Sequence, residues 1–181
     1  GVLDADLSLY VNHYRAAETT FSLVTQLVGR SGRGAAEGTA LIQTMCPEHP
    51  VLKLAAAQDY DGFYEMEIGL RELRGVPPFR DLITVTFTGL FEEHVRAGAK
   101  RFREALEMNL KNSPYAGMEL ELLGPVPAAV AKVNYTYRYR LTLSCKNNRQ
   151  IRALLSFLLG AFAKDKQNKG VSAFVDVNAY D

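Results

Sequence analysis

Residues 26–34 combine an amide, two guanidinium groups and several glycines in a spacing that can hold a phosphate. The segment reads Gln-x-x-Gly-Arg-x-Gly-Arg-Gly and ends a helical pattern. Gln26 and Arg30 are four residues apart, so they share one face of a helix. Arg33 follows Gln26 by seven residues and falls on about the same face, while Gly29 leaves that face bare.

This arrangement suits a nucleoside triphosphate whose charge shifts during phosphoryl transfer. An arginine that contacts the transferring group stabilises the negative charge that develops on it. Gln26, Gly29, Arg30 and Arg33 are therefore candidate nucleotide-binding residues, and the two arginines are candidate catalytic residues. The alternative is a solvated, basic helix terminus that the helix dipole favours.

A second candidate site interleaves tyrosine with arginine in a strand pattern. Side chains alternate between the two faces of a strand, so Tyr135, Tyr137 and Tyr139 point one way, whereas Thr136, Arg138 and Arg140 point the other way. Aromatic rings stack on unpaired bases and arginines neutralise phosphates. The pattern suits single-stranded DNA or a branched junction. The alternative is a hairpin whose tyrosines pack under helices, and we favour it for the tyrosines.

Charge is distributed unevenly along a chain whose net charge is +1. Between residues 126 and 170 the only acidic residue is Asp165, whereas the basic residues are Lys132, Arg138, Arg140, Lys146, Arg149, Arg152, Lys164, Lys166 and Lys169. A segment of one sign in a nearly neutral protein indicates an anionic partner or a solubilising surface.

Two prolines divide the chain at residues 75–78, because they cannot continue the preceding helix. We therefore expect domains at 1–76 and 77–181. The first should contain strands and helices in the order 1–6 (strand), 14–30 (helix), 38–44 (strand), 51–57 (helix) and 59–73 (helix). The expected core residues of its helices are Phe21, Val24, Val28, Tyr60, Phe63, Tyr64 and Ile68.

The second domain shows an alternation of strand and helix patterns. The expected elements are strand 82–88, helix 91–110, strands 119–123 and 135–145, helix 148–163 and strand 172–177. We expect residues 124–128 to form a rigid, extended connector and Asn147 to cap the second helix. The order β-α-β-β-α-β is typical of a ferredoxin-like sandwich with two helices on one face of the sheet. The fold class is therefore α+β, with an α/β remnant in the first domain.

Several classes of protein and site are disfavoured by composition. No apolar run reaches the ~18 residues that a membrane span requires, and the N-terminus does not resemble a signal peptide. Cys46 and Cys145 are far apart and are expected to be buried thiols of a reducing cytoplasm. His13, His49 and His94 have no ligand spacing, so we expect no metal site.

These segments together resemble the C-terminal part of the primosomal replication-restart helicases, a family within helicase superfamily 2. Residues 26–34 resemble the sixth motif of that superfamily. The resemblance also depends on the order and spacing of the flanking segments, which are residues 1–6, 14–18, 38–44, 47–50, 75–79 and 123–128. It covers essentially the whole chain.

The resemblance implies a truncated RecA-like helicase lobe 2 followed by a ferredoxin-like domain. The intact protein would be an ATP- and magnesium-dependent 3′-to-5′ DNA helicase that restarts stalled forks and assembles the primosome in the bacterial cytoplasm. Gln26 would sense the nucleotide, Arg30 would contact the γ-phosphate and Arg33 would be the arginine finger. Asp4 and Asp6 would couple ATP to DNA, or else simply cap the end of a strand.

The resemblance also implies partners for the second domain. They are single-stranded or forked DNA, the single-stranded DNA-binding protein and other primosome proteins. Because the family pattern has basic residues near Lys132 and Arg138, we favour a DNA contact for Lys132, Arg138 and Arg140.

The sequence lacks two parts that a helicase needs. It has no G-x-x-x-x-G-K-[ST] phosphate loop and no Asp-Glu pair after an apolar strand, which would cradle the phosphates and hold magnesium. We therefore expect a fragment without ATPase activity, and we expect the zinc-binding cysteines of the family to lie upstream of it. The alternative is a non-catalytic module that binds single-stranded DNA or a protein.

Overall fold

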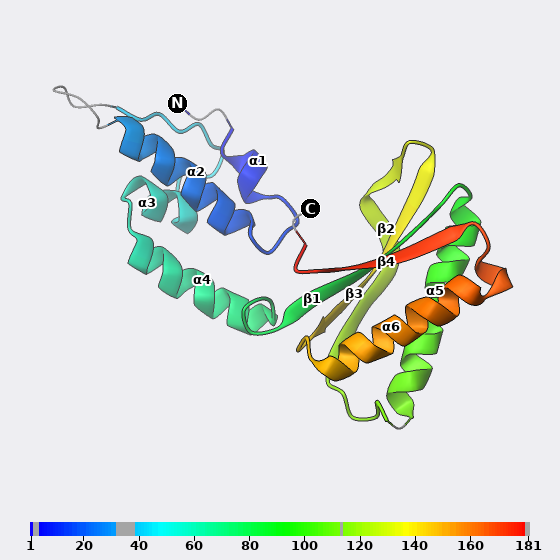
Figure 1. Cartoon of the computed structure of the whole chain (residues 1–181). Coiled ribbons are helices and arrows are strands. Elements are labelled where there is room, and N and C mark those ends of the chain that lie inside the picture. The colour runs from blue at the N-terminus through cyan, green and yellow to red at the C-terminus, as the bar shows by residue number, and fades with distance from the viewer. Residues whose placement is uncertain (2–3, 32–38, 113, 180–181) are drawn as a thin grey trace. The chain divides into compact units, whose positions relative to one another are not determined.

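The computed structural model of the chain describes residues 1, 4–31, 39–112 and 114–179 (Figure 1). The chain divides into two compact units, Gly1–Arg74 and Gly75–Tyr180, here called unit 1 and unit 2. Within the described ranges, no helix is both long and apolar enough to cross a membrane.

Unit 1 contains four helices within its described residues: α1 (Asp6–Leu9), α2 (Ala16–Ser31), α3 (Pro50–Ala56) and α4 (Tyr60–Arg74). Helix α3 begins where His49 accepts a hydrogen bond from the backbone N–H of Val51 (3.3 Å). Pro50 occupies the first helical position, where the missing N–H costs nothing. The buried apolar residues of the helices form one cluster, made of Ala5, Leu9, Phe21, Val24, Val51, Leu52, Ala55 and Phe63.

The prediction of two strands in unit 1 is wrong for its described residues. Asp6 begins helix α1 rather than ending a strand, and residues 39–44 contain only an isolated bridge at Ile42. Residues 2–3 and 38 of these predicted strands lie outside the described residues. A strand needs a neighbouring strand to satisfy its backbone groups, and described unit 1 has no ladder to supply one.

The predicted packing of aromatic residues along α4 is only partly correct. Phe63 is buried and stacks on Phe21, with 4.1 Å between the ring centroids. Tyr60 and Tyr64, however, are more than half exposed and stack on each other. Helical spacing places all three rings near one side of α4, but only the position that faces α2 is covered.

Unit 2 is built on one four-stranded antiparallel sheet. Its elements are β1 (Asp81–Gly89), α5 (Glu92–Lys111), β2 (Leu120–Val133), β3 (Thr136–Cys145), α6 (Arg149–Lys164), the short 3-10 helix η1 (Lys166–Asn168) and β4 (Val171–Val177). The strand order is β2-β3-β1-β4. Helices α5 and α6 lie on one face of this sheet (Figure 1). The predicted α+β class is confirmed.

The core of unit 2 lies between the sheet and its two helices. Strand β1 contributes Ile83, Val85 and Phe87, which are at most 1% exposed. The ring of Phe87 packs against Phe102 of α5 and Phe162 of α6, with centroid separations of 5.3 and 5.6 Å. The alternation predicted for this strand therefore correctly identifies the residues that face the helices.

The extended conformation predicted for residues 124–128 is present, but the segment is not a connector, because β2 runs through it as a strand with shifts in register. Strand β2 is at the edge of the sheet, where a proline that cannot donate a hydrogen bond is tolerated. Gly124 lies in this segment with a φ of +98°. A Cβ added at Gly124 would lie 2.6 Å from the backbone oxygen of Arg140, so only glycine fits there.

Helix α6 begins one residue later than predicted. Asn148, and not Asn147, is its N-cap, because the side chain of Asn148 accepts a hydrogen bond from the N–H of Ile151 at 3.0 Å. The backbone N–H of Asn147 instead donates to Asp81 at 3.0 Å. Adjacent asparagines cannot be distinguished as caps until the turn that precedes the helix is known.

Candidate nucleic-acid interface

Strand β3 presents its arginines and its tyrosines to opposite sides of the sheet. Tyr139 and the odd-numbered residues after it lie in the core against the helices. Because side chains alternate along a strand, Arg138 and Arg140 lie on the other face, here called the helix-free face. Both arginines are half-buried there. The predicted separation of Arg138 and Arg140 from Tyr137 and Tyr139 is therefore present.

Pairing between the strands sets the neighbours of each arginine on the helix-free face. Arg138 is opposite Thr88, which is opposite Ser172. Arg140 is opposite Thr86, and Thr86 is opposite Phe174. Residues directly opposite in an antiparallel pair have Cβ atoms about 4.5–5.5 Å apart. The face therefore combines cations, hydroxyl groups and one aromatic ring.

Phe174 is a candidate site residue that sequence reasoning did not identify. Its side chain is 43% exposed, whereas Thr86 between Phe174 and Arg140 is only 2% exposed. The alternation of β4 marks Phe174 as an outward residue, but only the strand order puts it beside the arginine row. The exposed ring of Phe174 is the part of this row onto which a flat base can stack.

Among the described residues, the acidic side chains of the helix-free face lie outside the rows of Arg138 and Arg140. Asp176 belongs to the row of Thr84 and Thr142, beyond the row of Arg140. Glu121 is opposite Ser144, still farther along β3, and its carboxylate is 2.9 Å from the guanidinium of Arg80. The end of this face nearest the β2–β3 hairpin is therefore the more basic one.

Lys132 does not join Arg138 and Arg140. It is opposite Tyr137 across the β2–β3 hairpin, and its ammonium donates a hydrogen bond to the Tyr137 hydroxyl at 3.2 Å. The same ammonium lies 4.6 Å from the centroid of the Tyr137 ring. The structure thus splits the predicted trio between the helix-free face and the end of the β2–β3 hairpin, residues 132–137, here called the hairpin arm.

The three tyrosines of this segment have different environments. Tyr139 is 7% exposed and its hydroxyl donates to a Glu92 carboxylate oxygen at 3.1 Å. Burial raises the pKa of Tyr139, and the hydrogen bond to Glu92 raises it further. Tyr137 packs against the edge of the core, so the packing role favoured from sequence is confirmed for these two. Tyr135 lies outside β3 and is 82% exposed.

Helix α2 carries the described part of the phosphate-site candidate in unit 1. Gln26, Gly29 and Arg30 are all exposed on this helix. The Gln26 side chain donates to the hydroxyl of Ser22, one turn earlier, at 3.2 Å. Arg33 lies outside the described residues, so its predicted role stays a prediction.

The environment of Asp6 in unit 1 differs from the strand end that the sequence predicts. Asp6 accepts hydrogen bonds from the hydroxyl of Thr44 (2.8 Å) and the backbone N–H of Met45 (2.7 Å). Both carboxylate oxygens therefore tie α1 to the segment before α3. The coupling role considered for Asp4 and Asp6 stays a prediction.

A partly buried guanidinium holds the start of α2 against α4. Arg71 lies 2.8 Å from carboxylate oxygens of both Glu18 and Glu67 and stacks over the ring of Tyr14 at 5.4 Å. Burial alone would lower the pKa of Arg71, but its bonds to Glu67 and Glu18 outweigh burial and raise it. This arginine serves the packing of unit 1.

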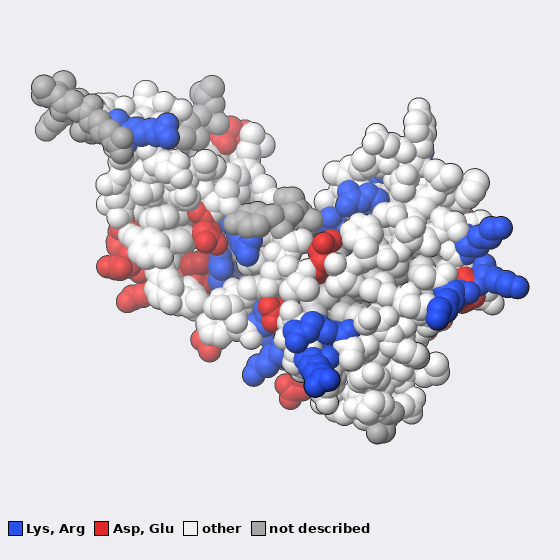
Figure 2. All heavy atoms as spheres, viewed as in Figure 1, with Lys and Arg blue, Asp and Glu red and all other residues white. Residues whose placement is uncertain are grey.

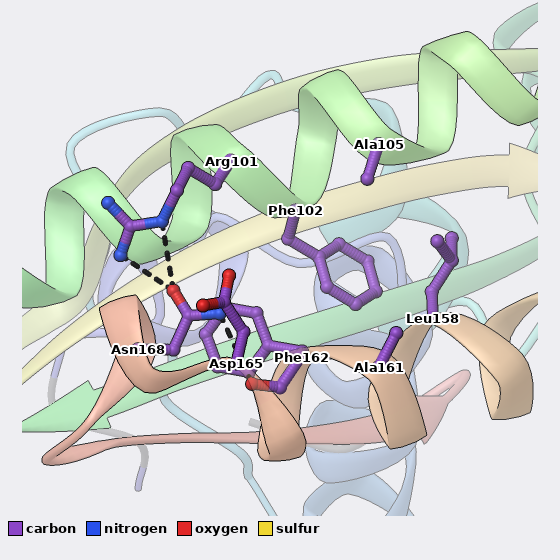
Figure 3. A pocket seen from close by; sticks show the side chains of 8 residues that line it. All are labelled: Arg101, Phe102, Ala105, Leu158, Ala161, Phe162, Asp165 and Asn168. Atoms are coloured by element: carbon purple, nitrogen blue, oxygen red, sulfur yellow. Dashed lines mark hydrogen bonds between the residues drawn. The ribbon is translucent and has the colours of Figure 1, made fainter.

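Figure 3 shows a small pocket between α5, α6 and η1. The Arg101 guanidinium donates to the Asn168 side-chain oxygen at 2.6 and 3.0 Å, and the Asn168 amide donates to the backbone oxygen of Phe162 at 3.2 Å. The cavity is about 130 Å³, which is smaller than the ~300 Å³ that a nucleotide-sized ligand needs. These contacts close the turn after α6 and form no nucleotide site.

Basic side chains of unit 2 do not form one continuous patch on the side seen in Figure 2, but lie in separate groups. The basic residues of the segment from 126 to 170 are spread over β2, β3, α6, η1 and the turns between them. Its charge therefore reaches several surfaces, and the helix-free face receives only the two arginines of β3 from this segment.

Neither cysteine has a metal-binding neighbourhood within the described ranges, where no cluster of three or more potential ligands occurs. Cys145 is buried at the end of β3, and burial raises the pKa of its thiol. Cys46 is partly buried and accepts a hydrogen bond from the Tyr10 hydroxyl at 3.3 Å.

Comparison with known proteins identifies relatives along the whole chain. The model of the primosomal protein N C-terminal domain matches residues 72–180. A protein of Bacillus subtilis named replication restart protein PriA is 34% identical over 99% of the chain, and that of Chlamydia muridarum is 34% identical over 98%. The protein of the same name from Borreliella burgdorferi is 26% identical over 99% of the chain.

These relatives are much longer proteins. The chain spans 22% of the Bacillus subtilis and Chlamydia muridarum proteins and 26% of the Borreliella burgdorferi protein. The match to the domain model covers all of unit 2, which includes the helix-free face and the hairpin. The chain therefore belongs to the family of primosomal protein N C-terminal domains, as the resemblance in its sequence predicted.

Proposed function

We propose that unit 2 binds single-stranded DNA across the helix-free face of its sheet. Phosphates would contact Arg138 and Arg140, and a base would stack on Phe174. The observation that carries the proposal is the row in which Arg140, Thr86 and Phe174 follow one another across β3, β1 and β4. Cationic grooves that contain aromatic side chains bind single strands without sequence preference.

The proposal treats unit 2 as a ferredoxin-like domain that occupies residues 77–181. The sheet order β2-β3-β1-β4 and the placement of both helices on one face support this assignment. Residues 1–76 would be the end of a RecA-like helicase lobe 2. Because the described part of unit 1 is helical, that assignment depends on the sixth-motif residues and on the relatives.

The protein to which this chain belongs would act in replication restart, as the names of its relatives indicate. It would be an ATP-dependent 3′-to-5′ DNA helicase that helps assemble the primosome in the bacterial cytoplasm. Its partners would be forked DNA, the single-stranded DNA-binding protein and other primosome proteins. Unit 2 would supply one of its contacts to DNA.

This chain would supply only one side of the site that binds ATP and magnesium. Gln26 and Arg30 fit a phosphate contact because both are exposed on α2 and four residues apart. The sequence has no phosphate loop and no Asp-Glu pair to hold magnesium. In a full-length relative, removal of the arginine that corresponds to Arg33 should lower ATP turnover about 10³-fold or more; unchanged turnover would contradict the arginine-finger assignment.

The second candidate function is a non-catalytic binding module, which is the better description of this chain by itself. The observation that favours it is the absence from the sequence of the phosphate loop, without which the nucleotide has no cradle. The purified chain should therefore bind DNA but should not hydrolyse ATP when single-stranded DNA is added. Hydrolysis at a helicase-like rate would contradict this description.

Fluorescence anisotropy with a labelled oligothymidine tests the DNA proposal. The chain should bind at about 50 mM salt and lose affinity steeply towards 200 mM. The double variant Arg138→Gln plus Arg140→Gln should lower the slope of log affinity against log salt by about 1.4, since each phosphate contact to a single strand contributes about 0.7.

The matched control removes two cations elsewhere in unit 2. Lys164→Gln plus Lys166→Gln changes the same net charge at the end of α6 and in η1, so a specific interface predicts a smaller loss than in the arginine variant. No binding at low salt would overturn the proposal. Equal losses in the two double variants would show that net charge alone, rather than the helix-free face, attracts DNA.

A further inference from the structure

The tip of the β2–β3 hairpin has an unusual residue in a left-handed conformation. Asn134 and Tyr135 join the two strands, with φ values of +47° and +64°. Two central residues with positive φ are typical of a type I′ turn, which matches the twist of a hairpin. Asparagine suits the first position, but the second usually needs glycine, because a bulky side chain there is strained.

The strain at Tyr135 is not compensated by packing. Its side chain is 82% exposed, so the ring is not part of the core cluster of unit 2. A glycine or asparagine at this position would make the turn at lower cost. Strain that the fold does not need indicates that the side chain itself is useful at the hairpin tip.

A cation lies beside this exposed ring. The Lys132 ammonium is 6.0 Å from the Tyr135 ring centroid and 4.6 Å from that of Tyr137. One of its donors serves the Tyr137 hydroxyl at 3.2 Å, and an ammonium group has three donors. No acidic residue occurs in the sequence between Glu121 and Asp165. The hairpin arm therefore carries no acidic side chain.

We propose that Tyr135 is a base-stacking residue, on whose ring an unpaired base of single-stranded DNA lies while Lys132 contacts an adjoining phosphate. This inference rests on the proposed binding of DNA by unit 2 and adds a second contact point, on the hairpin arm rather than on the helix-free face. An aromatic ring accepts any base, so the contact is tolerant of sequence. Lys132, which the structure separates from Arg138 and Arg140, thereby acquires its own role.

Three variants of the full chain separate stacking from folding. Tyr135→Phe keeps the ring and should bind oligothymidine as the unmodified chain does. Tyr135→Asn removes the ring but suits the left-handed turn, so it should weaken binding about fivefold or more while its melting temperature stays equal or rises. Lys132→Gln should lower the salt dependence of binding by the contribution of about one phosphate.

An abasic oligonucleotide of the same length provides the decisive comparison. It keeps the phosphates but offers nothing to stack, so the unmodified chain and Tyr135→Asn should bind it with the same affinity. If Tyr135→Asn binds oligothymidine as tightly as the unmodified chain, the inference is overturned, although the arginine variants still test the helix-free face. If the unmodified chain binds no DNA at about 50 mM salt, the proposed function and this inference both fail.

Discussion

Units 1 and 2 bury apolar surface in different ways. Among the described residues, sixteen buried side chains form one cluster between the sheet and helices of unit 2, whereas the cluster of unit 1 has eight. In unit 1, Leu41, Met45 and Leu73 are each more than 70% exposed. Unit 1 instead has hydrogen bonds and ion pairs that link its elements, here called polar ties: Asp6 and Arg71 each bind two partners.

The two units gain their rigidity from different interactions. The sheet of unit 2 fixes the spacing of Arg138, Arg140 and Phe174 through backbone pairing, so the candidate interface stands on a rigid element. In unit 1, Gln26 and Arg30 project from a helix that is held by few core residues and by charged contacts. Core substitutions should therefore matter most in unit 2, and polar substitutions should matter most in unit 1.

The largest expected effect comes from the centre of the unit 2 core. Phe87→Ala removes a side chain that is 0% exposed and should lower the free energy of unfolding of unit 2 by about 3–5 kcal/mol, through lost burial and a residual cavity. Denaturant unfolding followed by circular dichroism measures it. The matched control Phe157→Ala, at a position 59% exposed on α6, should change stability by about 0.5 kcal/mol or less; similar losses in both would refute the assigned core.

The next effect tests the polar ties of unit 1. Arg71→Ala leaves Glu67, whose side chain is 11% exposed, without its guanidinium and should cost about 1–3 kcal/mol. Hydrogen exchange of the α4 amides should report faster opening of unit 1 and no change in unit 2. Arg74→Ala, at an exposed position on the same helix, is the control. If it has the same effect, the contacts of Arg71 with Glu67 and Glu18 do not stabilise unit 1.

A smaller effect tests the aromatic part of the helix-free face. Phe174→Ala should weaken binding to oligothymidine about fivefold, because base stacking on an aromatic side chain is worth about 1–3 kcal/mol. Stability should change little at a position that is 43% exposed. Anisotropy titrations beside Phe157→Ala, on the opposite side of the sheet, measure the difference; equal affinities would remove Phe174 from the interface.

The smallest effect concerns alkaline pH. Because burial and Glu92 raise the pKa of Tyr139, the folded state favours the neutral phenol. The resulting stabilisation is complete below the ordinary tyrosine pKa of about 10 and is lost as pH rises towards the raised value. Tyr139→Phe should remove this part of the pH dependence, so that its stability falls less than that of the unmodified chain above about pH 10. Parallel declines would contradict the raised pKa.

Much of unit 2 could be predicted from local pattern. Ile83, Val85 and Phe87 alternate with threonines, which predicts a strand with one buried face, and the apolar spacing of Val95, Phe102 and Leu106 predicts its helix. The continuation of β2 through Pro125 and Pro127 was not predictable, because a proline is acceptable in a strand only at an edge, and strand order decides which strand is at an edge.

The sequence by itself determined the order and type of most elements of unit 2, the opposite directions of its tyrosines and arginines along β3, and the family to which the chain belongs. These depend on periodicity and on motifs that local residues carry. Tertiary structure alone decided that Phe174 lies in the row of Arg140, that Lys132 lies with Tyr137, and that Tyr135 is a strained hairpin tip. Register between strands and the conformation of a turn join residues that are distant in sequence, so no local pattern contains them.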